Sequence, residues 1–269
     1  MPIETIRWKN LPSQFIDPRP IDIWLPPSYH EQNNQRYPVL YMHDGQNLFF
    51  KKEAYSKVNW GVVPAMNRLV KQGKTREAII VGIWNTEKRI QEMLPWKPIA
   101  TSIRGMKIYE KHQEEIGQVV SDGYLKYMVE ELKPQIDNHF RTLTGIEDTF
   151  VMGSSMGGLI SLYAICEYPN IFGGAGCVST HWPALKQLMI NYLKKNMPNP
   201  VNHKLYFDYG TVNSEVEYEP YQNRVDLVLQ KGGYISGKNW ITRKFEGHDH
   251  HESYWRKRVH IPLKLFLKK

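Results

Sequence analysis

Short runs of β-branched and aromatic residues alternate along this chain with longer amphipathic segments. The short runs predict strands at residues 21–25, 38–43, 78–84, 148–153, 174–179, 204–210 and 239–247. The longer segments predict helices at 61–72, 123–140, 156–168, 184–195, 219–232 and 253–267. This alternation is typical of βαβ units and predicts an α/β protein built on a mainly parallel sheet.

The predicted strands should differ in how far other parts of the protein bury them. In 21–25, isoleucine and leucine alternate with Asp22 and Trp24, which indicates a half-exposed, antiparallel strand. The continuous apolar runs at 38–42 and 78–83 indicate strands that are covered on both faces. Pro134 should kink or split the helix predicted at 123–140.

A single domain over residues 1–269 is expected, since this length suffices for one large core. Residues 95–122 fit neither the strand nor the helix period, and long loops in compact domains are often functional. We expect a lid-like excursion near the site. The alternative is a plain surface loop with a short helix around 110–117.

Composition narrows the class of protein. The net charge of +8 arises from scattered basic residues, and the longest basic block is the three residues 256–258, so nucleic-acid binding is not expected. No apolar run reaches the roughly 18 residues of a membrane span, and residues 1–14 lack the features of a signal peptide. We expect a soluble, cytoplasmic protein, with export after removal of a signal left open. Cys166 and Cys177 match no zinc spacing and should be buried thiols.

The segment Gly153-Ser154-Ser155-Met156-Gly157 is a GxSxG motif with Ser155 at its centre. It follows an apolar strand and precedes a helical pattern, which is the context of a nucleophile elbow. Glycines two residues away on either side would allow the strand and helix to approach closely. Such a turn exposes the Ser155 hydroxyl and directs the Met156 N–H toward a developing oxyanion. Glycine patterns typical of nucleotide-binding loops are absent from the sequence.

A nucleophilic serine needs a histidine base and an acid, which follow it in this order in α/β hydrolases. His248, His250 and His251 come after the last predicted strand, and their spacing alone does not choose among them. HExxH is absent because Trp255 stands at the second histidine position, so a metal site is not expected. Glu215 and Glu217 follow the strand at 204–210 and are the candidate acids. Asp208 should be structural, and Asp249 lies too close in sequence to the histidines.

Several segments together resemble one family. They are DIWLPPSY (22–29), YPVLYMHDGQNLF (37–49), VGIWNTEKRIQEMLP (81–95), the elbow GSSMGG, FDYGT (207–211) and GHDHHESYWRKR (247–258). The chain resembles the esterase branch of the α/β-hydrolase superfamily that includes esterase D, feruloyl and acetyl-xylan esterases, siderophore esterases and the antigen 85 mycolyltransferases. This resemblance implies an α/β-hydrolase fold, with a mostly parallel sheet of about eight strands and helices on both faces.

The resemblance also implies roles for particular residues. A Gly-x-x-His-x-Glu-x-x-Trp pattern selects His250 as the base. Relatives often carry an Asp where this chain has Asn213, and others place a carboxylate slightly later, which favours Glu215 over Glu217. The second oxyanion donor maps to the backbone N–H of Gln46, with Asn47 as the weaker choice. Asp44 should brace this loop through local backbone amides.

These residues predict a serine esterase that forms an acyl-enzyme and needs no cofactor or metal. Its partner should be a small-molecule ester, either a simple one or one linked to a carbohydrate or phenol. Neither nucleic acid nor a membrane is expected as a partner, and the sequence predicts no particular oligomeric state. Candidate substrate-lining residues follow strand ends: Trp84, Arg89, Trp96, His181 and Trp182. The aromatic residues are equally compatible with core packing, and Arg89 with a local ion pair. An acyltransferase to a sugar or other alcohol, or a catalytically silent binding protein, are the alternatives.

Overall fold

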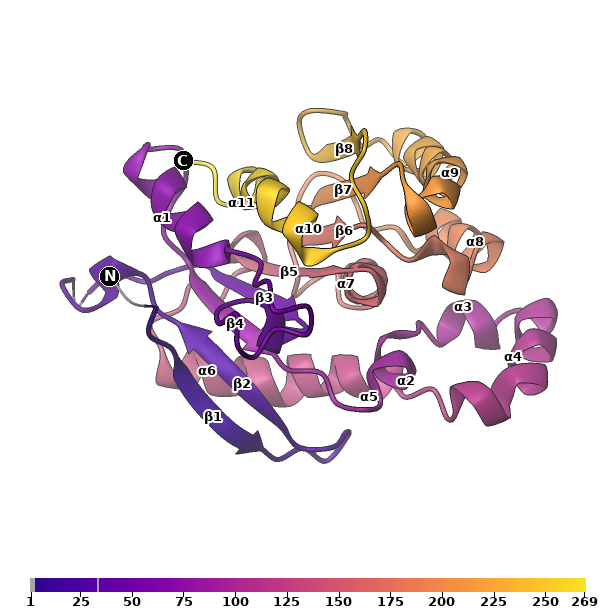
Figure 1. Ribbon diagram of the computed structural model, residues 1–269, viewed down its shortest axis with the longest axis horizontal. Coiled ribbons are helices and arrows are strands. Elements are labelled where there is room, and N and C mark those ends of the chain that lie inside the picture. The colour runs from indigo at the N-terminus through magenta and orange to yellow at the C-terminus, as the bar shows by residue number, and fades with distance from the viewer. Residues whose placement is uncertain (1–2, 33) are drawn as a thin grey trace.

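An eight-stranded sheet forms the centre of the protein, whose computed structural model describes residues 3–32 and 34–269 (Figure 1). The strands are β1 (Ile6–Leu11), β2 (Arg19–Trp24), β3 (Val39–His43), β4 (Ile79–Ile83), β5 (Thr149–Ser154), β6 (Gly174–Val178), β7 (Lys204–Gly210) and β8 (Trp240–Phe245). Their order is β1-β2-β4-β3-β5-β6-β7-β8. Strand β2 pairs antiparallel with β1 and β4, and the remaining neighbours pair parallel. This topology confirms the predicted α/β-hydrolase fold.

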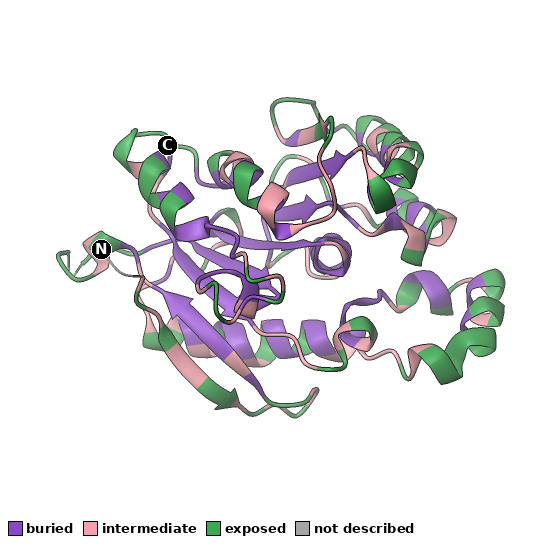
Figure 2. Cartoon of the chain, in the orientation of Figure 1, coloured by how far each residue is buried: buried purple, intermediate pink, exposed green. Residues whose placement is uncertain are grey.

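Helices cover both faces of the sheet, as predicted. One face carries α5 (Ser121–Lys126), α6 (Lys133–His139), α7 (Met156–Glu167), α8 (Gln187–Asn196) and α9 (Tyr218–Lys231), and the other carries α1 (Val62–Lys71), α10 (Glu252–Arg258) and α11 (His260–Phe266). Val39 and Tyr41 of β3 pack in the first layer, and Leu40 and Met42 pack in the second, because successive strand side chains point to opposite faces. All of β3 and β4 is buried, as their apolar runs predicted (Figure 2).

The expectation of a half-exposed strand at 21–25 is wrong, although its antiparallel pairing is confirmed. Asp22 and Trp24 of β2 are buried, Asp22 at 1% exposure. Arg7 of β1, a strand that the hydrophobic pattern missed, donates to both Asp22 oxygens at 2.6 and 2.8 Å. The Trp84 indole donates to the same carboxylate at 2.9 Å. Asp22, a polar residue among apolar ones, therefore forms a buried ion pair with Arg7 and does not face solvent.

Two prolines alter the helices predicted at 123–140 and 253–267. Between α5 and α6 the chain keeps winding through a π-helical stretch, Tyr127–Leu132, just before Pro134. A wider turn accommodates proline, whose ring would clash with the carbonyl four residues earlier in an α-helix. The predicted helix 253–267 is divided into α10 and α11 at Val259, because Pro262 has no N–H to donate to the Arg258 carbonyl.

The segment 95–122 is mostly helical. After α2 (Arg89–Met93) it forms α3 (Lys97–Ala100) and α4 (Ile103–Ile116), which extend from the body of the protein (Figure 1). The Ser102 side chain caps α4 by accepting from the Gly105 N–H at 3.2 Å, and Trp96 packs edge-on against Tyr109 with centroids 5.1 Å apart. The helix in this segment is thus longer than the one around 110–117 in the alternative of a plain surface loop. A lid function for this segment stays a prediction.

Both cysteines are buried free thiols, as predicted. Burial raises the pKa of Cys166 and Cys177, which suppresses thiolate chemistry. None of the helices in the described ranges is long and apolar enough to span a membrane.

Candidate functional site

The backbone at Ser155 has the strained geometry of a nucleophile elbow. Its φ of 58° and ψ of −120° are rarely adopted by residues other than glycine. Its N–H donates to the Val178 carbonyl of β6 at 2.9 Å, and its carbonyl accepts from the His181 N–H at 3.1 Å. These bonds hold the turn between β5 and α7, and α7 is buried along almost its whole length. A rigid frame therefore maintains the strain at Ser155.

The flanking glycines have the steric role that the motif suggested. A Cβ on Gly153 would lie 2.7 Å from the carbonyl carbon of Gly157, and a Cβ on Gly157 would lie 3.3 Å from His43 Cβ. Real Cβ atoms do not approach backbone as closely as the first distance. The strand and helix can meet here only without a side chain at 153.

The oxyanion donors predicted from the sequence are the backbone amides of Met156 and Gln46, and this role stays a prediction. Met156 is the first residue of α7, so its N–H has no acceptor within the helix. Gln46 lies in the 3-10 turn Gly45–Asn47 and lines the same pocket as Ser155. The Asn47 N–H already donates to the Asp44 carbonyl at 2.9 Å. Of the two residues considered for the second donor, Gln46 therefore has the better case.

Glu215 and His250 are brought together from different parts of the sheet edge. His250 Nδ1 lies 3.0 Å from Glu215 Oε1, and Gly210 donates its backbone N–H to the other carboxylate oxygen. Burial by itself would raise the pKa of Glu215, but hydrogen bonds from His250, Ser179 and Gly210 outweigh it and lower the pKa. A buried, ionised carboxylate that accepts from Nδ1 leaves Nε2 of His250 free to act as a base.

The other candidate acids have different surroundings. Glu217 is exposed, whereas Glu215 is 1% exposed. Asp249 accepts from the His250 backbone N–H at 2.7 Å and from the Asn213 side chain at 2.7 Å, so it braces the loop. Asp208 is buried and pairs with Arg258, in line with a structural role.

The other two histidines also differ from His250. His248 stacks on Phe245 with ring centroids 5.2 Å apart. His251 caps α10 by accepting from the Ser253 N–H at 3.1 Å. His250 is the histidine that contacts Glu215.

A buried network behind Glu215 was not apparent from the sequence. The Ser179 hydroxyl accepts from Arg258 Nη2 at 2.6 Å and from the Trp255 indole at 2.9 Å, and it lowers the pKa of Glu215 by hydrogen bonding. Arg258 Nε lies 3.2 Å from Asp208 Oδ2. Arg258 belongs to the short basic block 256–258, yet it is 1% exposed. Ser179, with φ of 43°, is held by these donors of α10 and by the bond from its own N–H to Asp208 Oδ1 of β7 at 3.0 Å.

Ser155 and His250 open into one pocket of about 530 Å³. Its wall also contains Gln46, Tyr55 and Arg89. Tyr55 is 89% exposed and offers a free aromatic ring at the rim, a residue that no sequence motif indicated. The volume fits a small or medium-sized organic ligand.

Of the five predicted substrate-lining residues, Arg89 lines this pocket. Trp182 is wrong in this role, because it is 1% exposed and stacks on Phe207 in the core. Trp84 binds Asp22, and Trp96 packs on Tyr109. His181 lies beside His250 with ring centroids 6.4 Å apart and bonds the Tyr218 hydroxyl at 2.9 Å. Burial, followed by the charges of His250 and Arg89, lowers the His181 pKa to about 4, so it is neutral near pH 7.

Asp44 is held by side chains, which corrects the expectation that it braces the loop through backbone amides. Arg89 donates to its two oxygens at 2.7 and 2.8 Å, and Asn85 donates at 2.5 Å. Burial alone would raise the pKa of Asp44, but the Arg89 charge and hydrogen bonds lower it. This ion pair fixes Asp44 at its φ of 56° directly before the Gly45–Asn47 turn. Arg89 thus positions the loop that carries the Gln46 N–H.

The fold and the pocket place the protein in the class of α/β-hydrolase-type proteins with a serine at the elbow. The family model described as "Putative esterase" matches residues 13–260, and the chain belongs to this family. This membership confirms the resemblance inferred from the motifs.

Two curated relatives are similar in sequence. One is "Uncharacterized protein YbbA" of Bacillus subtilis, 26% identical over 170 residues, which are 61% of this chain and 58% of the relative. The other is an "Endo-1,4-beta-xylanase/feruloyl esterase" of Xylanibacter ruminicola, 24% identical over 67% of this chain and 23% of the relative. The chain therefore spans little more than half of the first and about a quarter of the second.

Solved structures share the fold. A ferulic acid esterase superposes with a TM-score of 0.70 at 16% identity, over 99% of both chains. The enterobactin esterase of Shigella flexneri superposes with a TM-score of 0.69 at 18% identity, over 99% of this chain and 59% of that one.

Gly153→Ala should destabilise the protein by about 1–3 kcal/mol, because its Cβ would force β5 and α7 apart. Urea unfolding measures the change. Gly232→Ala is the matched control, since Gly232 has φ of −79° and its added Cβ would find its nearest neighbour at 3.3 Å. Equal effects in the two variants would contradict the close approach at the elbow.

Arg258→Met should lower the free energy of unfolding by about 3–5 kcal/mol, because it leaves Asp208 buried without its cation. Combining it with Asp208→Asn should recover part of the loss, which a double-mutant cycle measures. A single-variant loss below about 1 kcal/mol would mean that the pair is not essential.

Protonation of His43 should destabilise the fold in mild acid. Its Nδ1 lies 2.7 Å from the Tyr124 hydroxyl, and burial lowers its pKa from 6.5 to about 4. The unfolded chain then binds the extra proton between these values, so stability falls as pH drops through this window. Between pH 7.5 and 5, His43→Gln should lose about 2 kcal/mol less than the unaltered protein. Parallel stability curves for the two proteins would disprove this role.

Proposed function

We propose that this protein is a serine-dependent carboxylic ester hydrolase that acts through Ser155, His250 and Glu215. The observation that carries the proposal is that Ser155, strained at the elbow, shares one pocket with a histidine whose Nδ1 lies 3.0 Å from a buried carboxylate. Membership in the "Putative esterase" family supports the same reaction class.

In the proposed first step, His250 Nε2 accepts the proton of the Ser155 hydroxyl as its oxygen attacks the ester carbonyl. The N–H groups of Met156 and Gln46 stabilise the oxyanion of the tetrahedral intermediate. The leaving alcohol then takes the proton from His250, and an acyl-enzyme remains on Ser155. Glu215 stabilises the imidazolium and keeps Nδ1 protonated.

In the second step, water attacks the acyl-enzyme. His250 accepts a proton from this water and returns it to Ser155 when the carboxylic acid leaves. No step in this sequence requires a metal or organic cofactor. The two steps together convert one ester and one water molecule into an alcohol and a carboxylic acid. Ser155 and His250 return to their starting states.

The substrate class proposed is a small ester linked to a phenolic or carbohydrate group. The pocket volume of about 530 Å³ and the exposed ring of Tyr55 support a ligand with a flat or ring-shaped portion. The names of similar proteins support a phenolic or carbohydrate-linked ester, since they include a feruloyl esterase and an enterobactin esterase.

Hydrolysis of p-nitrophenyl acetate tests the reaction. Ser155→Ala and His250→Ala should each lower kcat by at least about 10⁴-fold, because the three residues act as a unit. Glu215→Gln should lower kcat by about 10²-fold or more, whereas Glu217→Gln, an exposed carboxylate two residues away, should leave it unchanged.

Full activity in Ser155→Ala would disprove the mechanism, and loss confined to Glu217→Gln would transfer the role of the acid. Fluorophosphonate labelling of Ser155 without turnover of simple esters would favour an acyltransferase. Product analysis with added acceptor alcohols then identifies the transferred acyl group.

A further inference from the structure

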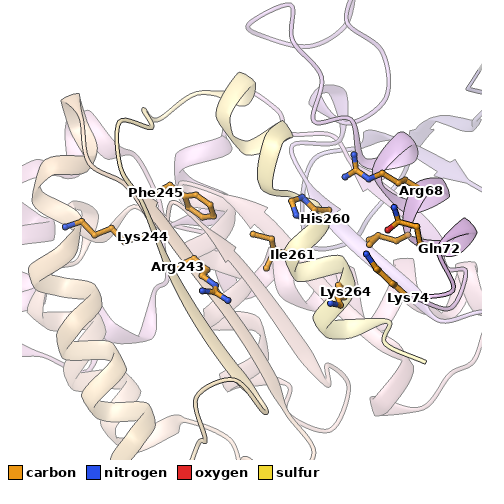
Figure 3. Close-up of a pocket in the computed structure, with 10 residues that line it drawn as sticks. Arg68, Gln72, Lys74, Arg243, Lys244, Phe245, His260, Ile261 and Lys264 are labelled. Atoms are coloured by element: carbon orange, nitrogen blue, oxygen red, sulfur yellow. The ribbon is translucent and has the colours of Figure 1, made fainter.

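A second pocket, which shares no lining residue with the pocket of Ser155, is lined by cationic side chains. It has a volume of about 650 Å³ and is formed by the end of α1 with its following loop, by β8 and by α11. Figure 3 shows α11, which carries His260 and Lys264, between β8 with Arg243 and the α1 region with Arg68 and Lys74. No carboxylate is among its lining residues.

Four of the five cations that line this pocket are not neutralised locally. Among the described residues, the ion pairs leave Arg68, Lys74, Arg243 and Lys264 without a carboxylate partner. Lys244, the fifth cation of the lining, differs, since it pairs with Glu219 at 3.0 Å and with Glu246 at 3.1 Å. In Figure 3 it extends to the other side of β8 from Arg243. The neighbouring side chains Arg243 and Lys244 thus have opposite electrostatic surroundings.

Protection of an edge strand explains only part of this cluster. β8 is the last strand of the sheet, and charged residues on edge strands prevent pairing with other chains. That role accounts for Arg243 and Lys244. Arg68, Lys74 and Lys264 come from α1, its following loop and α11, so edge protection does not require them.

The pKa of His260, which lines the pocket, reflects the positive electrostatic potential there. Burial, followed by the positive charges of Arg68, Lys264 and Lys74, lowers the pKa of His260. The same cations that disfavour a proton on His260 favour an anion in the hollow. Leu69, Phe245 and Ile261 add an apolar portion to the wall.

We propose that this pocket binds a small, multiply charged phosphate compound, such as pyrophosphate or a nucleoside diphosphate. Four unpaired cations from three elements match a ligand with at least two phosphoryl groups. The volume holds far more than one phosphate ion, since a water molecule occupies about 30 Å³ in the liquid. The apolar wall has room for the organic part of such a ligand. This site is separate from Ser155 and does not depend on the proposed esterase reaction.

Titration calorimetry with pyrophosphate at constant ionic strength tests the site on the full chain. Replacing two cations in Arg243→Gln/Lys264→Gln should weaken binding by about tenfold or more. Lys52→Gln/Lys71→Gln removes the same number of charges from exposed residues that do not line the pocket, and it should leave the affinity unchanged. Absence of binding at millimolar pyrophosphate, or equal weakening in Lys52→Gln/Lys71→Gln, would overturn the proposal.

A second measurement uses the unaltered protein, so it holds even if the double variant unfolds. Saturation with pyrophosphate should raise the pKa of His260 in an NMR titration, because the bound anion offsets Arg68, Lys74 and Lys264. By linkage, the affinity should increase as pH falls through the range in which His260 takes up a proton.

Sodium chloride at the same ionic strength is the control for this titration, and an equal shift of the His260 pKa with chloride would overturn a specific site. A smaller shift with inorganic phosphate than with pyrophosphate is expected, and an equal shift would contradict recognition of two phosphoryl groups.

Discussion

A charged carboxylate kept inside the protein is the interaction on which the candidate site depends. Glu215 is 1% exposed, and an ionised carboxylate is stable there only if several donors surround it. His250, Ser179 and the Gly210 N–H supply these donors. Ser179 in turn is bound by Arg258, whose guanidinium pairs with Asp208. The orientation of the His250 ring is thus connected to buried charges that do not line the pocket.

The strain at Ser155 is the second constraint, and the sheet maintains it. A left-handed serine is unfavourable by itself, so the surrounding contacts must determine it. Bonds to Val178 and from His181 tie both sides of the turn to β6 and its following loop. The absence of a Cβ at Gly153 lets α7 lie directly against β5. The chemistry proposed for Ser155 therefore depends on rigid packing rather than on a flexible loop.

Charge is distributed very differently around the two pockets. In the Ser155 pocket, Arg89 is neutralised by Asp44, so its main effect is to fix the turn that carries Gln46. In the pocket between α1, β8 and α11, several cations have no partner among the described residues. The net charge of +8 is therefore concentrated in part at one hollow that is distinct from the elbow.

The sequence by itself determined the strand and helix alternation, the elbow at Ser155 and the neighbourhood of the acid and histidine. These features are local: hydrophobic period, glycine spacing and chain order suffice to predict them. Missed elements were those whose residues are stabilised by distant partners, such as β1 with Arg7 on Asp22. Tertiary structure decided the contact of His250 with Glu215, the burial of Arg258 and Trp182, and the pairing of Asp44 with Arg89. Burial and charge pairing join residues far apart in sequence, so a pattern along the chain does not contain them.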